Sequence, residues 1–155
     1  NSLDLNVSKD MVIDFSRSTL SLPGSSIIHG NVVEVVDRYK YLGSWIDNKL
    51  QFDTNTDSIF KGGQQRIYLL RKLNYFHENK RILCNFYCCF IESLLTFSFI
   101  CWYKGLSVKN KNKLQNIVKI CSKIIGVKQR DLQSLWEEQP FHALHSEFLL
   151  MPSGR

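Results

Sequence analysis

The sequence predicts an α+β fold, in which a small antiparallel sheet or hairpin precedes a three-helix bundle. Short apolar and β-branched runs with turn residues between them fill residues 10–48. Segments with helical spacing of apolar residues, bounded by capping residues, fill residues 53–126. We expect three parts, at residues 1–50, 51–128 and 129–155, and the last of these is predicted to be an irregular tail.

The first part contains the expected strands. Residues 10–15 are an apolar, β-branched run, and residues 27–28 and 32–36 flank His29-Gly30-Asn31. A Gly between two such runs predicts a hairpin, because it supplies the positive φ of a tight turn. Residues 39–46 form a further candidate strand, and Gly43 inside it indicates a bulge or a close backbone approach.

Three helices should follow. The first is expected over residues 53–75, with a weak point at Gly62-Gly63, since each Gly costs about 1 kcal/mol relative to Ala in a helix. The second is expected over residues 79–103 and is apolar almost all round, which predicts a buried central helix. The third should begin after a cap at Ser107 and end near Gly126.

The charge of the chain is uneven. The whole chain has a formal net charge of +6, but residues 61–130 hold fourteen lysines and arginines against only Glu78 and Glu92. Such a block over helical segments indicates contact with a polyanion, the backbone of a nucleic acid above all. A solvated, lysine-rich helix face is the alternative.

The cysteines and carboxylates give no sign of a metal site. The five cysteines lie in apolar helical segments without paired Cys-x-x-Cys units, which predicts buried free thiols in a reducing compartment. Asp53 and Asp57 are four residues apart, a position that the dipole of a helix N-terminus explains. The apolar run of residues 82–101 contains Glu92, so we expect a core helix and no contact with a membrane.

Several motifs occur in a particular order. Leu3–Lys9 precedes an apolar strand, and the Tyr41-Leu42-Gly43 turn comes next, followed by Gly63–Arg66 and Leu69–Leu73 on the first helix. In this order they resemble the C-terminal side of the reverse transcriptase, an RNA-directed DNA polymerase, of non-LTR (LINE-type) retrotransposons. The resemblance implies that Tyr41–Gly43 is the turn that grips the primer and that the helices form the thumb.

The same resemblance implies a piece of a polymerase without its chemistry. The family's Mg²⁺-binding aspartates occur as Tyr-Ala-Asp-Asp, and no adjacent Asp-Asp occurs here, so no cofactor is expected in this chain. Lys9 matches the family's lysine near the leaving pyrophosphate, although the Thr-Lys that usually follows is missing. Template–primer binding would remain, on one shared surface formed by Tyr41, Leu42, Gly43, Lys61, Arg66, Lys72, Lys109, Lys113, Lys119 and Lys123.

The Tyr-Leu-Gly stretch is also similar to the N-terminal domain of AlkB-homologue proteins that modify tRNA. Those proteins pair a 2-oxoglutarate dioxygenase with a methyltransferase. The sequence has neither a His-x-Asp for iron nor a Gly-x-Gly turn after a strand, so this resemblance implies a non-catalytic interaction module.

We expect an intracellular location, nuclear or cytoplasmic, and the chain is expected to be a fragment of a longer protein. The expected partners are an RNA–DNA or DNA duplex and, for the polymerase reading, the rest of the parent enzyme. A protein-interaction module, with the helical bundle docking a partner chain, is the other class of function that the apolar second helix indicates.

Overall fold

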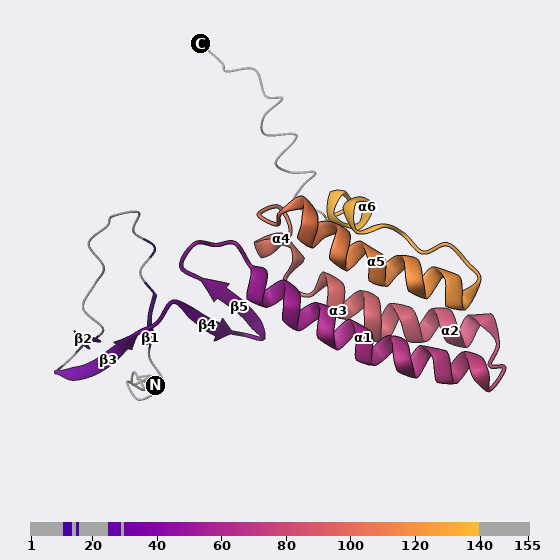
Figure 1. Ribbon diagram of the computed structural model, residues 1–155, viewed down its shortest axis with the longest axis horizontal. Coiled ribbons are helices and arrows are strands. Elements are labelled where there is room, and N and C mark those ends of the chain that lie inside the picture. Colours follow the sequence, from indigo (N-terminus) through magenta and orange to yellow (C-terminus); the bar gives the residue numbers. More distant parts are fainter. Residues whose placement is uncertain (1–10, 14, 16–24, 29, 140–155) are drawn as a thin grey trace, which may run out of the picture. The chain divides into compact units, whose positions relative to one another are not determined.

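A computed structural model describes residues 11–13, 15, 25–28 and 30–139 (Figure 1). It divides into two compact units, and the boundary falls between Asn55 and Thr56. The described strands lie in the first unit, whereas the helices fill the second, apart from the first turn of α1. The α+β class predicted from the sequence is therefore confirmed.

Two small sheets form the first unit. The three-stranded sheet has the order β1-β3-β2, with β1 parallel to β3 and β2 antiparallel to it; its strands are β1 (Met11–Val12), β2 (Ser25–Ile28) and β3 (Asn31–Val35). Ile28 pairs with Asn31, and Gly30 between them has a φ of +77°. The predicted hairpin is thus present at the predicted turn.

The second sheet corrects the prediction of one interrupted strand over residues 39–46. Residues there form two antiparallel strands, β4 (Arg38–Tyr41) and β5 (Ser44–Asp47). Leu42 and Gly43 make the two-residue turn between them, with φ values of +45° and +91°. Two successive positive φ angles match the twist of a tight hairpin, so Gly43 reverses the chain and does not form a bulge.

The first helix of the second unit is α1 (Asp53–Tyr75), with the predicted bounds. It continues through Gly62 and Gly63 without interruption. A Cβ atom on Gly63 would lie 2.5 Å from Cδ1 of Ile117, and one on Gly62 would lie 3.2 Å from Cδ2 of Leu94. The glycines therefore allow two other helices to approach α1 closely, and the expected weak point is a packing site.

The prediction of one continuous α-helix over residues 79–103 is wrong, because the segment is divided. It consists of α2 (Lys80–Phe86), the π-helical η2 (Tyr87–Glu92), α3 (Ser93–Thr96) and α4 (Phe99–Trp102). Buried side chains recur every four residues, at Tyr87, Ile91, Leu95 and Phe99. A four-residue spacing drifts around an α-helix of 3.6 residues per turn, and the wider π turn brings these side chains back to one side.

The segment breaks at Ser98, which has a φ of +51°. Nε1 of buried Trp102 donates a 2.8 Å hydrogen bond to the carbonyl oxygen of Phe97 and so holds the break. The outer side of the segment is exposed, with Phe90 at 53% and Phe97 at 52%, which corrects the prediction of burial all round. By length and composition alone, Lys80–Trp102 is the one described helix that could cross a membrane, which is weak evidence for a span.

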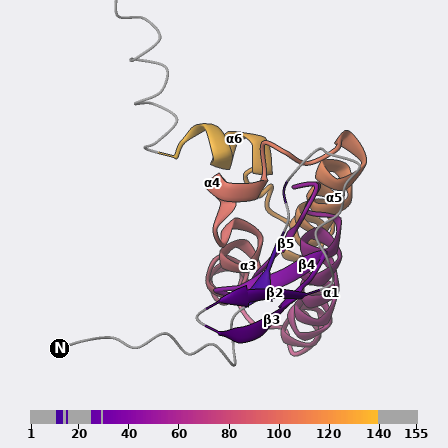
Figure 2. The same ribbon diagram turned by 90° about the vertical axis from the view of Figure 1, so that its left-hand side faces the viewer.

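The third predicted helix is α5 (Val108–Ile125), with both ends as predicted. Oγ of Ser107 accepts a hydrogen bond from the backbone N–H of Asn110, and Gly126 ends the helix with a φ of +74°. Its core positions are Leu114, Ile117, Val118, Cys121 and Ile125, all buried. Seen nearly end-on in Figure 2, α1, α3 and α5 occupy separate corners of the second unit.

Part of the predicted irregular tail is helical. Asp131 caps α6 (Leu132–Glu137) by accepting a 2.8 Å hydrogen bond from the N–H of Ser134, while Leu132 and Leu135 are buried. Arg130, which precedes α6, lies 3.3 Å from a carboxylate oxygen of Glu92 and 2.8 Å from one of Glu138, the residue after α6. The rest of the predicted tail, residues 140–155, lies outside the described residues.

Candidate nucleic-acid interface

The hairpin turn is the first candidate surface. Tyr41 is 58% exposed and Leu42 is 75% exposed, at the end of the β4–β5 hairpin. A positive φ is uncommon for a residue with a side chain, and it costs of order 1–3 kcal/mol in sparsely populated regions. Leu42 therefore exposes an apolar side chain to solvent, and its backbone has a positive φ that Gly would adopt more easily.

A network behind this hairpin holds the loop that leads into α1. One carboxylate oxygen of Asp47 accepts hydrogen bonds from the N–H groups of Lys49 (3.1 Å) and Gln51 (3.0 Å), and the other accepts from Phe52 (2.7 Å). Leu50 and Phe52 have φ values of +52° and +57°. Asp47 thus stabilises a strained loop. The sequence showed only an aspartate near the end of a predicted strand and did not indicate this role.

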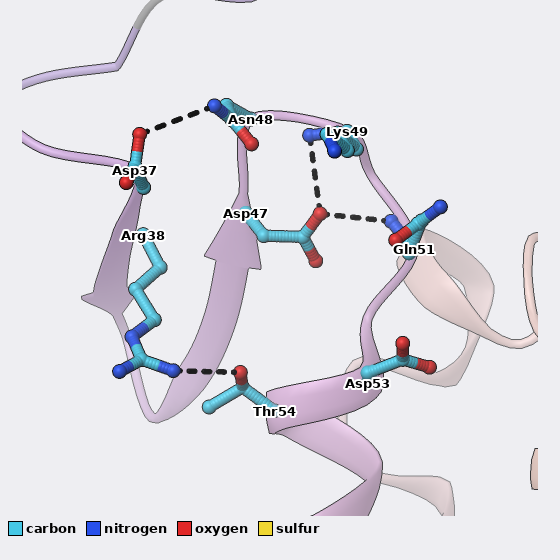
Figure 3. A pocket seen from close by; sticks show the side chains of 8 residues that line it. All are labelled: Asp37, Arg38, Asp47, Asn48, Lys49, Gln51, Asp53 and Thr54. Atoms are coloured by element: carbon cyan, nitrogen blue, oxygen red, sulfur yellow. Dashed lines mark hydrogen bonds between the residues drawn. The ribbon is translucent and has the colours of Figure 1, made fainter.

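An open, polar pocket of about 480 Å³ lies beside this loop (Figure 3). Much of its lining is internally bonded: Asn48 Nδ2 donates to Asp37, and Arg38 donates to Oγ1 of Thr54. The remaining lining residues are Asp47, Lys49, Gln51 and Asp53. Among the described residues, no group of three or more His, Cys, Asp or Glu side chains is placed to hold a metal ion, at this pocket or elsewhere.

The predicted lysines lie on the outward sides of two helices. Lys61 and Lys72 are exposed on α1, and Nζ of Lys72 lies 5.0 Å from the centre of the Tyr68 ring. Lys109, Lys119 and Lys123 are exposed on α5. Figure 2 shows α1 and α5 as separate helices of this unit, so the predicted lysines come from two elements of the bundle.

Two of the predicted phosphate-binding side chains, Lys113 and Arg66, are only partly exposed. Nζ of Lys113 lies 2.6 Å from Oδ1 of Asp57 and 4.7 Å from the centre of the Phe60 ring, so its charge is already paired within the bundle. Arg66 is half-buried, and its Nη1 atom is enclosed with no hydrogen-bond partner among the described residues. The pairing of Lys113 with Asp57 on α1 was not indicated by the spacing of charges along α5. Lys9 lies outside the described residues.

The thiols divide by their surroundings. Burial raises the pKa of Cys121 to about 12, and burial is also the main cause that raises the pKa of Cys88, with a contribution from Glu92. Cys88, Cys89 and Cys101 are exposed, which corrects the prediction that all five are buried. Burial likewise raises the pKa of Tyr87 far above its usual value, and its hydroxyl has no partner among the described residues.

Comparison with known proteins gives one family match, over residues 52–93. The matching model is described as alkylated DNA repair protein alkB homolog 8, N-terminal. It covers α1 and continues through α2 and η2, which is less than half of the chain. No curated protein and no solved structure matches. The match supports the AlkB-homologue resemblance and gives no support to the reverse-transcriptase resemblance.

Proposed function

We propose that this chain is a non-catalytic module that binds a nucleic-acid duplex through phosphate contacts made by its helical unit. The observation that carries the proposal is the row of exposed lysines on α5: Lys109, Lys119 and Lys123. In the described part of the chain, salt bridges engage only Lys113 and Arg130 among the basic side chains. The charges of the α5 row are therefore available to a partner.

The spacing of the row suits a linear polyanion. Lys109 and Lys123 are fourteen residues apart on one helix, which corresponds to about 21 Å at 1.5 Å per residue. This length exceeds the Debye length of about 8 Å in physiological salt, so the row acts as separate contacts along a backbone and not as one point charge. Each lysine that neutralises a phosphate releases a counterion, which favours binding at low salt.

The family match supports the class of partner. The name of the matched family refers to the repair of alkylated DNA, and a module carried by such a protein would act beside a nucleic-acid substrate. Binding of this kind requires no cofactor from this chain, and it is consistent with an intracellular location in the nucleus or the cytoplasm.

A charge-removal experiment tests the proposal. Lys109→Gln, Lys119→Gln and Lys123→Gln combined should weaken binding to a fluorescent DNA duplex at low salt by a factor of about ten or more. The matched control removes three exposed lysines from elsewhere, Lys40→Gln, Lys49→Gln and Lys104→Gln, with the same change in net charge. Equal losses of affinity in the two variants would show that net charge matters and the α5 row does not. Absence of binding by the unmodified chain would contradict the proposal.

A second candidate function follows from the exposed hairpin turn. By the sequence resemblance, this turn would correspond to the part of a reverse transcriptase that touches the primer end, and the chain would then bind a template–primer without polymerisation. In that reading the parent enzyme supplies the Mg²⁺ site and is itself a partner. Tyr41→Ala should then weaken binding to a duplex with a recessed 3′ end more than binding to a blunt duplex, and equal effects on the two would exclude this function.

A further inference from the structure

The outward side of α5 carries two amides as well as lysines. Asn112 and Asn116 lie between Lys109 and Lys119, and all of these side chains are exposed. At 100° per residue, these four residues and Lys123 lie within roughly 80° of arc, opposite the buried side of α5. The row therefore consists of a pair of asparagines with a lysine on one end and two on the other.

The two amides have no role within the described fold. Neither Asn112 nor Asn116 bonds another described residue through its side chain, whereas the Asn79 amide oxygen caps α2 and that of Asn55 accepts from the N–H of Trp45. Asn is also a poorer helix former than Lys or Ala by a few tenths of a kcal/mol. Each amide offers one acceptor and two N–H donors to an external partner.

The chemistry of this row selects among nucleic acids. The face has no aromatic side chain for base stacking, which disfavours a single strand as its ligand. The deep, narrow major groove of an RNA duplex is closed to side chains, whereas the major groove of B-form DNA, about 12 Å wide, admits an α-helix. B-form DNA is therefore the duplex whose major groove is wide enough to receive this side of α5.

The spacing of the amides matches base pairs in that groove. Asn112 and Asn116 are one turn apart, about 6 Å along the axis, and two base-pair steps of 3.4 Å cover nearly the same distance. An asparagine amide forms a bidentate pair with N6 and N7 of adenine in the major groove. The lysines at the ends of the row would then face the phosphates that border the groove.

We propose that α5 enters the major groove of B-form DNA, where Asn112 and Asn116 read adenines while Lys109, Lys119 and Lys123 contact flanking phosphates. This inference rests on the proposed function, because it assigns the duplex and the base-reading residues to the same lysine row. It adds sequence preference, which phosphate contacts alone do not give.

The test compares adenine with 7-deazaadenine, which lacks the N7 acceptor, in otherwise identical DNA duplexes rich in adenine–thymine pairs. The unmodified chain should bind the adenine duplex about tenfold more tightly, and Asn112→Ala with Asn116→Ala should remove this difference. Both substitutions are at exposed helix positions where Ala is favoured, so the variant retains the helix. Gln64→Ala with Gln65→Ala, which removes two exposed amides from α1, is the matched control and should behave as the unmodified chain.

The outcomes separate this inference from the proposed function. Salt-dependent binding of DNA duplexes with no response to 7-deazaadenine or to the asparagine changes would overturn base reading and leave phosphate binding intact. Equal or tighter binding of an RNA duplex would overturn the assignment to the B-form major groove. Failure to bind any duplex at low salt would remove the proposed function itself.

Discussion

Replacing Gly63 with Ala tests the close packing of α1 against α5. The new Cβ would lie 2.5 Å from Cδ1 of Ile117 and 3.5 Å from both Cγ atoms of the same side chain. Ile117 is 1% exposed and has little room to turn away, so overpacking should cost about 1–3 kcal/mol. Ala gains about 1 kcal/mol over Gly in a helix, which leaves a net destabilisation of about 1 kcal/mol.

A double-mutant cycle between Gly63 and Ile117 measures this contact directly. Ile117→Val removes the Cδ1 atom, and in that background Gly63→Ala should stabilise the chain by about 1 kcal/mol through helix propensity. The sign of the effect therefore reverses, with a coupling energy of about 1–3 kcal/mol, measurable by urea denaturation. Gly62→Ala, whose Cβ would meet only the movable end of Leu94, is the control. The same effect of Gly63→Ala in both backgrounds would refute the contact.

Three further predictions concern the loop, the last helix and the thiols. Asp47→Ala removes the acceptor of three backbone N–H groups, so the hydrogen exchange of these amides should become faster, with a loss of about 2–3 kcal/mol of protection free energy. Unchanged exchange would contradict the role of Asp47. The pKa of Asp131 is lowered, chiefly by the N–H of Ser134, so its cap stabilises α6 above the unfolded pKa of about 3.9 and this stability is lost as pH falls through the lower folded pKa. Asp131→Asn should abolish that acid response in the Ser134 amide signal, and a persisting response would assign it to another group. Cys121, with a pKa of about 12, should resist a thiol reagent at pH 8 while exposed Cys101 is modified, as mass spectrometry of the two peptides would show.

The parts of the fold that local chemistry determines could be predicted from the sequence. Ser107 and Gly126 bound α5 as expected, since a hydroxyl cap and a left-handed Gly act within one turn of the helix end. The π turn of η2 could not be predicted in this way. It depends on which side chains of the segment are buried by other helices, and an apolar run with few polar positions does not determine that choice.

In the candidate site too, features set within one helix could be predicted, whereas contacts between helices could not. Helical spacing placed Lys109, Lys119 and Lys123 on one outward side, because that result needs only the period of the helix. The pairing of Lys113 with Asp57 joins residues 56 positions apart, and Nη1 of Arg66 is enclosed in the fold. Neither could be read from the spacing of charges along one segment.

The dependence of duplex affinity on salt tests the central claim most directly. The unmodified chain should bind a DNA duplex with a logarithmic affinity that falls linearly with the logarithm of salt concentration, and loss of the three α5 lysines should reduce the slope by about three. A slope that is the same in the two proteins, or binding that does not respond to salt, would contradict the account.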